Sequence, residues 1–414
     1  MEKTIKFIAI NFIILLLTSC TISIDKPMEK EDIFSENENQ DDEIVDVNDK
    51  IDSQISKMTI DEKISQLLII GLDGLELNQN ERDLLKEYSF SGIIFFNRNI
   101  ESKEQFINLI NDLKSINADK IPFFLSIDEE GGRVERLNLF YESIPSMGVI
   151  GEYNDIKLSY EVGRVLGDKL KTFGLNMNFA PVLDINSNPK NPVIGDRSFG
   201  NNPEVVSILG QEIYKGITKQ GVISVGKHFP GHGDTIKDSH YELPVINKSL
   251  SELEEMELKP FIYNINSGLD AIMVGHLLLP ELSDKPSSLS REIINDLLRV
   301  KLNFEGIILS DDMTMGAITE EYNLEDAILQ FFIAGGDIAL VCHDNSEIKD
   351  IIEYIKLAID QEKITEKEID IKLHRIIYIK EKYNLNNHEI SRYLIDERIN
   401  EINEKIEEII QEVK

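Results

Sequence analysis

Residues 306–312 read GIILSDD, a short aliphatic run that ends in two aspartates. Apolar, β-rich runs of this kind predict buried strands of a parallel sheet. Between the runs apolar residues recur with helical spacing, and one α-helix is predicted near Ser290, with Ile294, Leu297 and Leu298 in phase. Strands that alternate with helices favour a (β/α)8 barrel, with a doubly wound open sheet as the alternative. The eight predicted strands are 67–71, 92–96, 123–127, 177–181, 222–225, 271–274, 306–309 and 337–341.

The start of the chain predicts export. Lys3 and Lys6 precede the apolar run 7–17, which is too short to span a bilayer comfortably. The run ends in Leu-Thr-Ser-Cys, similar to a bacterial lipobox, so we expect residues 1–19 to be a signal peptide and Cys20 to be lipidated. The protein would then be extracytoplasmic and anchored to the bacterial cell membrane. An ordinary signal peptide with an incidental cysteine is the alternative.

The remaining chain is divided by composition. A stretch rich in Asp, Glu, Asn and Ser predicts a disordered tether at 20–55, followed by a catalytic domain at 56–375 and a C-terminal helical extension at 376–414. Besides the anchor cysteine, Cys342 is the only thiol, so no intramolecular disulfide is expected. A formal net charge of −32 argues against a nucleic-acid partner, and we expect a monomer.

Polar side chains follow nearly every predicted strand. In barrels of this kind the catalytic groups lie at the carboxyl ends of the strands, where the connecting loops meet. Convergence of so many charged and imidazole groups predicts a polar pocket there. The residues are Asp73, Asn97, Arg98, Asp128, Asp184, Lys227, His228, His276, Asp311, Asp312 and His343.

The densest cluster is KHFPGHGDT at 227–235, followed by DSH at 238–240. Asp238 and His240 are two residues apart, so in an extended segment their side chains point the same way and can form a hydrogen bond. A carboxylate that pairs with imidazole suits proton transfer near neutral pH. This pair is therefore the candidate acid/base.

A zinc site built from the same segment is the rival interpretation. Imidazole and carboxylate groups bind zinc, and the ligands would be His228, His232, Asp234 and His240. Metal-dependent barrel hydrolases usually begin with a histidine pair after the first strand, where this chain has Gly-Leu-Asp at 71–73. We therefore expect no metal and no cofactor.

The paired aspartates supply the candidate nucleophile. A carboxylate at a rigid strand end is suited to attack an anomeric carbon, as a retaining glycosidase requires. The other aspartate is suited to cap the following helix. These residues alone leave open whether Asp311 or Asp312 reacts.

Four segments give the chain a resemblance to glycoside hydrolase family 3, in particular its β-N-acetylhexosaminidase branch, from about residue 56 to 373. They are DEEGGRV at 128–134, NFAPVLD at 178–184, the histidine segment at 227–240 and SDDM at 310–313. The resemblance implies a retaining, two-step mechanism with Asp311 as nucleophile, His240 as acid/base and Asp238 as its partner. One departure is Glu135, where relatives often have glutamine; we interpret it as without consequence, the alternative being altered substrate contacts.

The resemblance also implies the substrate contacts. Asp128, Arg197, Lys227 and His228 match positions that hold the sugar hydroxyls, and Asp184 lies in a matching segment and is expected to bind substrate too. The expected activity is removal of terminal β-linked N-acetylglucosamine from peptidoglycan fragments or muropeptides. Two alternatives stay open: a β-N-acetylglucosaminide phosphorylase on the same scaffold, and a lipoprotein that binds wall glycans without cleaving them.

Overall fold

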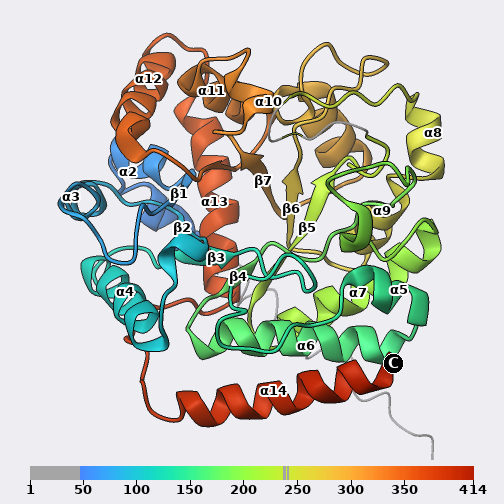
Figure 1. The fold of residues 1–414 in the computed structure, drawn as a ribbon. Coiled ribbons are helices and arrows are strands. Elements are labelled where there is room, and N and C mark those ends of the chain that lie inside the picture. The colour runs from blue at the N-terminus through green and yellow to red at the C-terminus, as the bar shows by residue number, and fades with distance from the viewer. Residues whose placement is uncertain (1–46, 236–238, 240–241) are drawn as a thin grey trace, which may run out of the picture. The chain divides into compact units, whose positions relative to one another are not determined.

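The computed structural model describes residues 47–235, 239 and 242–414, so the predicted signal peptide, Cys20, Asp238 and His240 lie outside the described residues. Eight parallel strands form a closed barrel in sequence order (Figure 1). The (β/α)8 fold is confirmed, and a strand lies at each of the eight predicted places, with β4 shorter and β5 and β7 longer than predicted. The open sheet is wrong because β1 pairs with both β2 and β8. The strands are β1 (Leu68–Gly71), β2 (Gly92–Phe95), β3 (Phe124–Ile127), β4 (Met177–Asn178), β5 (Ile223–Phe229), β6 (Ala271–Val274), β7 (Ile307–Asp312) and β8 (Ile338–Val341).

Helices cover the outside of the barrel and bury its apolar strands. In α4, for example, the Ser102 side chain accepts the Gln105 N–H and so caps the first turn, and Phe106, Leu109 and Ile110 lie on the buried face. The helices are α2 (Ile60–Ser65), α3 (Gln79–Glu87), α4 (Lys103–Ile116), α5 (Met147–Tyr153), α6 (Ile156–Thr172), α7 (Pro203–Lys219), α8 (Leu250–Glu255), α9 (Lys259–Asn266), α10 (Gly316–Thr319), α11 (Leu324–Ala334), α12 (Ile348–Asp360), α13 (Glu366–Lys382) and α14 (Ile395–Glu412).

The helix predicted near Ser290 differs from expectation in its hydrogen bonding. Glu292–Lys301 is a π-helix, and the Leu302 N–H donates to the Leu297 carbonyl five residues back. Ile294, Leu297 and Leu298 are buried as predicted. Side-chain spacing therefore identified the buried face, but it does not distinguish bonds to the fourth residue from bonds to the fifth.

Two predicted domain boundaries differ from those in the structure. Residues 47–55 are helical, and Ile51 and Ile55 are 1% and 4% exposed within the barrel core, so the predicted tether at 20–55 is too long by its last nine residues. Val47, Ile51 and Ile55 recur every four residues, a helical signal inside an acidic stretch. The boundary predicted at 375 falls inside α13.

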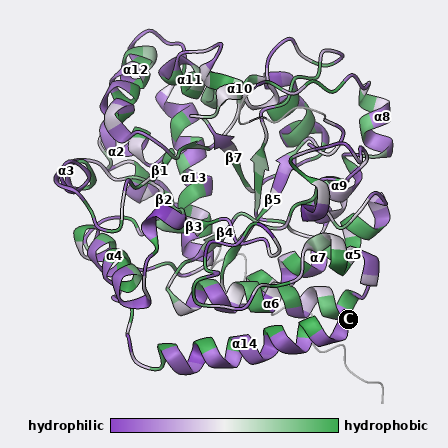
Figure 2. Cartoon of the chain, in the orientation of Figure 1, coloured by the Kyte–Doolittle hydropathy of each residue, from purple (hydrophilic) through white to green (hydrophobic). Residues whose placement is uncertain are grey.

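The final helix packs against the barrel's outer layer. Figure 1 shows α14 alongside α6, and Ile399, Ile402 and Ile406 are buried. Figure 2 shows hydrophilic residues over much of the rest of α14, as expected for a helix with one face toward solvent. Among the described residues no helix has the length and apolarity needed to cross a membrane.

Candidate active site

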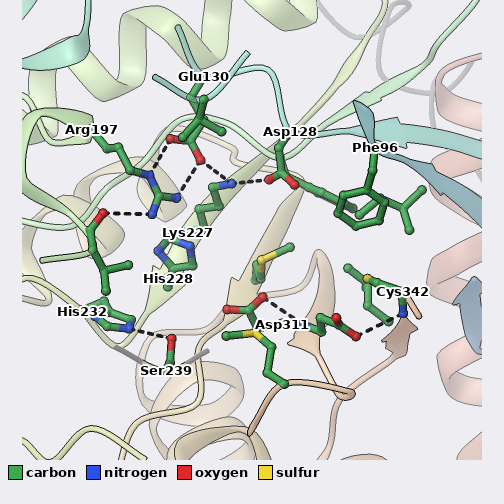
Figure 3. A pocket seen from close by; sticks show the side chains of 18 of the residues that line it. Phe96, Asp128, Glu130, Arg197, Lys227, His228, His232, Ser239, Asp311 and Cys342 are labelled. Atoms are coloured by element: carbon green, nitrogen blue, oxygen red, sulfur yellow. Dashed lines mark hydrogen bonds and ion pairs between the residues drawn. The ribbon is translucent and has the colours of Figure 1, made fainter. Parts of the chain in front are cut away.

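A cavity lies at the carboxyl ends of the strands, where the sequence predicted it (Figure 3). The residues that follow several different strands meet there because the closed barrel brings all the strand ends to one rim. Among the residues predicted to react or to bind the sugar, Asp128, Arg197, Lys227, His228 and Asp311 line the cavity, and so does Asp312.

A buried charge network forms one wall. Lys227 Nζ lies 2.6 Å from Asp128 Oδ1 and 2.6 Å from Glu130 Oε1. Arg197 binds Glu130 with two hydrogen bonds, Nε to Oε2 at 2.8 Å and Nη2 to Oε1 at 2.7 Å (Figure 3). Paired bonds of this kind fix the plane of a guanidinium as well as its position. The network therefore presents oriented donors and an acceptor to a polyhydroxylated ligand.

Glu130 is a site residue that the sequence reasoning missed. It is 2% exposed, and burial alone would raise its pKa, but Arg197 and Lys227 outweigh burial and hold the pKa far below the ordinary value. Glu130 is thus ionised and neutralises two cations that would otherwise repel each other. The available signal was its position two residues after Asp128, which places both side chains on the same side of an extended segment.

The two adjacent aspartates have different surroundings. Asp312 accepts hydrogen bonds from the Thr314 N–H at 3.0 Å, the Thr314 hydroxyl at 2.7 Å and the Cys342 N–H at 3.1 Å. Asp311 accepts the Asp312 N–H at 2.8 Å through Oδ1, and no described residue donates to its Oδ2. Asp312 is therefore committed to holding the turn after β7, whereas Asp311 keeps an oxygen for the cavity.

The charge state of Asp311 suits a nucleophile. Burial acts to raise its pKa, but His228 and His276 nearby and the Asp312 N–H outweigh burial, so the pKa of Asp311 lies below its ordinary value. A carboxylate must be deprotonated to attack an anomeric carbon. The structure thus distinguishes two aspartates that the sequence left equivalent.

Asp184 lies behind the cavity, not in its lining. It is fully buried and accepts His228 Nδ1 at 2.7 Å, the His228 N–H at 3.2 Å and the His232 N–H at 2.6 Å. The expected direct contact between Asp184 and substrate is therefore replaced by a supporting role. Its bond to Nδ1 leaves Nε2 as the His228 nitrogen that can act in the cavity.

Arg136 also lines the cavity and was not predicted as a site residue. Its backbone N–H is held by Glu129 Oε2 at 2.7 Å. Its guanidinium Nε is buried without a hydrogen-bond partner among the residues the structure covers. The residue as a whole is half-buried and lines the cavity, so its charge lies beside the space that a ligand would occupy. Sequence alone gave no signal, because pairing is a property of the folded chain.

The negative charge of Glu135, where relatives often have glutamine, is paired with a lysine outside the cavity. Glu135 Oε1 lies 2.9 Å from Lys169 Nζ, and both side chains are almost fully buried. Lys169 also pairs with Glu129, whose other oxygen holds the Arg136 and Leu137 N–H groups. Glu135 does not line the cavity, which agrees with the interpretation that it leaves substrate contacts unaltered.

The remaining predicted rim residues divide into two groups. His343 lines the cavity, and Arg98 Nη1 lies 3.2 Å from its Nδ1. His276 and Asp73 do not line it. His276 is buried and bonded to the Ser288 hydroxyl at 2.7 Å and the Asp312 carbonyl at 3.0 Å, so it supports the turn that carries the aspartates. Convergence on the rim therefore does not by itself place a side chain in the site.

The zinc alternative gains no support from the described ligands. Within residues 47–235, 239 and 242–414, no group of three or more His, Cys, Asp and Glu side chains is arranged to hold a metal ion. Asp234 is instead 2.8 Å from Lys248 Nζ, and both ring nitrogens of His232 face hydroxyl groups. His240, the fourth member of that ligand set, lies outside the described residues.

Comparisons with known proteins agree with this geometry. A family model described as Glycosyl hydrolase family 3 N terminal domain matches residues 59–379. A β-hexosaminidase of Hydrogenovibrio crunogenus is 33% identical over 294 residues, covering 70% of this chain and 82% of the relative. A solved family 3 β-N-acetylglucosaminidase from Paenibacillus sp. is 36% identical, with a TM-score of 0.77 over 84% of this chain and 69% of that one. NagZ from Neisseria gonorrhoeae, solved in complex with N-trifluoroacetyl-D-glucosamine, is 29% identical, with a TM-score of 0.68 over 84% of this chain and 98% of that one. The chain therefore belongs to glycosyl hydrolase family 3 and is a glycoside hydrolase.

Proposed function

We propose that the protein is a retaining exo-β-N-acetylglucosaminidase with Asp311 as its nucleophile. The observation that carries this proposal is the carboxylate of Asp311 at the end of β7. It has a lowered pKa, no described residue donates to its Oδ2, and it lies at a cavity that is also lined by Lys227 and Arg197. The β-hexosaminidase and β-N-acetylglucosaminidase relatives support N-acetylglucosamine as the sugar. The enzyme would need neither metal nor cofactor.

In the first step an Asp311 oxygen attacks the anomeric carbon as the glycosidic bond breaks, giving a covalent glycosyl-enzyme and a leaving alcohol. His240, with Asp238 as partner, would give the leaving oxygen its proton. In the second step the same imidazole would take a proton from water, which displaces Asp311 and restores the β-anomer. Both residues lie outside the described part of the chain, but Ser239 between them lines the cavity, which supports this assignment.

Substrate binding would use the charge network. Lys227, His228 and Arg197 supply donors to sugar hydroxyls, while Asp128 supplies an acceptor. Arg136, which lines the cavity, would add a further cation beside the substrate. Because each paired cation is already held by a carboxylate, the donors need little reorganisation when the sugar binds.

Peptidoglycan fragments are the proposed natural source of the sugar, and the outer face of the cell membrane is the proposed location. Both rest on the sequence of the first twenty residues, in which a short apolar run leads into Cys20. An enzyme tethered there by acyl chains would meet wall fragments as they are released.

The test replaces Asp311 and Asp312 separately. With 4-nitrophenyl N-acetyl-β-D-glucosaminide, Asp311→Ala should lower the hydrolysis rate by about 10⁴-fold or more, as expected when a covalent nucleophile is lost. Asp312→Asn, a matched control that keeps the side-chain shape, should retain far more activity because it acts on the turn and not on the sugar.

Product analysis completes the test. The first-formed sugar should be the β-anomer, and added phosphate should not change the product. Formation of sugar phosphate would replace hydrolysis with phosphorolysis, and measurable glycan binding without any cleavage would favour the non-catalytic alternative. Full activity of Asp311→Ala would reject Asp311 as the nucleophile.

A further inference from the structure

Phe96, Arg98 and His343 form a cluster that the chemistry proposed above does not use. Phe96 and Arg98 follow β2, and His343 follows β8. Phe96 (Figure 3) and His343 line the same cavity as Asp311, whereas Arg98 does not line it. The cluster therefore contributes two aromatic rings to the wall of the active-site cavity.

The guanidinium of Arg98 holds this cluster together. Its Nε donates to the Leu72 carbonyl at 2.7 Å, its Nη2 donates to the Cys342 carbonyl at 2.6 Å, and its Nη1 lies 3.2 Å from His343 Nδ1. The guanidinium carbon also lies 4.4 Å from the centre of the Phe96 ring. Each nitrogen of Arg98 thus has a partner, and the side chain fixes both rings from one position.

Gly71 makes this arrangement possible. It is the last residue of β1, which pairs with β2 on one side and with β8 on the other. A Cβ at Gly71 would lie 2.9 Å from Arg98 Nη2 and 2.1 Å from the Cys342 carbonyl oxygen. Because glycine has no Cβ, the Arg98 side chain can cross the end of β1 and reach the residues that follow β8.

Arg98 also decides which nitrogen of His343 carries the proton. Arginine only donates hydrogen bonds, so His343 Nδ1 accepts and the ring proton is on Nε2. Nε2 lies 3.8 Å from Asp312 Oδ2, which is too far for a hydrogen bond, and no described residue accepts from it. The Phe96 ring lies beside the imidazole, with 5.3 Å between the ring centres. His343 thus adds one oriented donor to the cavity lining.

His343 lies nearer to solvent than the charge network does. The side chains of Lys227 and Glu130 are 2% and 1% exposed, whereas the side chain of His343 is 57% exposed. In the proposed function the charge network holds the terminal sugar, so the rest of the substrate must extend toward solvent. An exposed residue of the cavity lining is therefore placed to contact the group that leaves.

We propose that His343 binds the leaving sugar, with its Nε2–H donating to a hydroxyl, ring or carbonyl oxygen of that sugar, and that Phe96 and Arg98 hold the imidazole in place. This inference rests on the proposed function, because it concerns the group that departs when Asp311 attacks. It makes a saccharide, and not an aryl alcohol, the leaving group that this cavity recognises.

The experiment compares a saccharide and an aryl leaving group in the full chain. His343→Leu removes the donor and should lower kcat/KM for N,N′-diacetylchitobiose by about 3- to 10-fold, the usual value of one hydrogen bond between neutral groups. The same variant should leave kcat/KM for 4-nitrophenyl N-acetyl-β-D-glucosaminide nearly unchanged, because the nitrophenyl group has no hydroxyl or ring oxygen to accept the bond. Both measurements report the stabilisation of the transition state relative to free enzyme and substrate.

Two further variants separate the lost donor from general damage. His343→Gln, whose amide nitrogen can take the place of Nε2, should recover most of the chitobiose activity. His388→Leu is the matched control, because His388 is exposed and does not line the cavity. It should leave the cleavage of both substrates unchanged.

Equal losses on both substrates in His343→Leu would overturn the proposal, since they would place His343 at the terminal sugar. Unchanged cleavage of chitobiose in that variant would also overturn it, and so would an unmodified enzyme that cleaves only the aryl substrate. An unmodified enzyme that cleaves neither substrate would instead count against the proposed function, so the two failures are distinguishable.

Discussion

Two buried lysines at opposite ends of the barrel have opposite kinds of partner. At the carboxyl end, burial would lower the pKa of Lys227, but Asp128 and Glu130 outweigh it and raise the pKa. At the amino end, Lys380 of α13 is equally buried, and its Nζ donates to the Ser91 carbonyl at 2.8 Å and to Gln66 Oε1 at 3.1 Å. Burial holds the pKa of Lys380 well below its ordinary value, and no described carboxylate pairs with it.

The comparison shows at which end of the barrel a buried lysine is kept charged. Carboxylates at the catalytic end keep Lys227 charged in front of the substrate, at the cost of desolvating three ions together. At the opposite end Lys380 has only neutral carbonyl and amide partners and the Phe124 ring, 4.6 Å away, and burial outweighs them and lowers its pKa. Arg136 is a third case, a half-buried cation at the catalytic end whose guanidinium Nε has neither kind of partner among the described residues.

The largest expected effect comes from breaking the paired cation. Lys227→Met leaves Asp128 and Glu130 without their shared partner and should lower the free energy of unfolding by about 3–5 kcal/mol at neutral pH. Denaturant unfolding measures this loss. Because protonation relieves the uncompensated carboxylates, the loss should shrink as pH falls below about 4.

A second change sharpens that result. Adding Glu130→Gln to Lys227→Met should restore part of the lost stability, since the two residues are in direct contact. Unchanged stability in Lys227→Met would contradict the view that these carboxylates depend on the lysine.

The unpaired cation should affect catalysis and not folding. Arg136→Met should lower kcat/KM on a disaccharide substrate by about 10- to 100-fold, the usual value of a charged hydrogen bond, while leaving unfolding nearly unchanged. Arg133→Met is the matched control, because Arg133 is half exposed, pairs with Asp196 at 3.0 Å and does not line the cavity. Similar losses in both variants would remove Arg136 from substrate binding.

The smallest expected effect lies at the amino end, and it has the opposite sign. Lys380→Met should raise the free energy of unfolding at pH 7 by about 1–2 kcal/mol, because an apolar chain of similar size replaces a buried amine. A lowered folded pKa means that the unfolded chain binds the extra proton, so the native protein loses stability as pH falls from about 10 toward neutral. The gain in the variant should therefore grow over that range.

The control is two residues away on the same helix. Lys382 Nζ lies 2.5 Å from Asp270 Oδ1, so Lys382→Met should lower stability where Lys380→Met raises it. A loss of stability in both variants would show that the two lysines are equivalent and would erase the contrast between the ends of the barrel.

Local patterns in the sequence determined the barrel and the identity of its rim. Each strand is a short apolar run between amphipathic helices, and this pattern depends only on which residues face the core, as 306–312 illustrates. The strand ends then identified Asp128, Lys227 and Asp311, because parallel strands must end on the same side. Resemblance to a family added Arg197, which no periodicity would have singled out.

Tertiary structure alone decided which charges meet. Asp128 and Lys227 are 99 residues apart in the chain, and Glu130 and Arg197 are 67 apart, so their pairing exists only once the barrel closes. For the same reason the fold assigned Asp184 to a supporting place and left Arg136 without a partner. Burial patterns can be predicted from residues that are close together in the sequence, whereas hydrogen bonds between distant side chains depend on the packing of the whole domain.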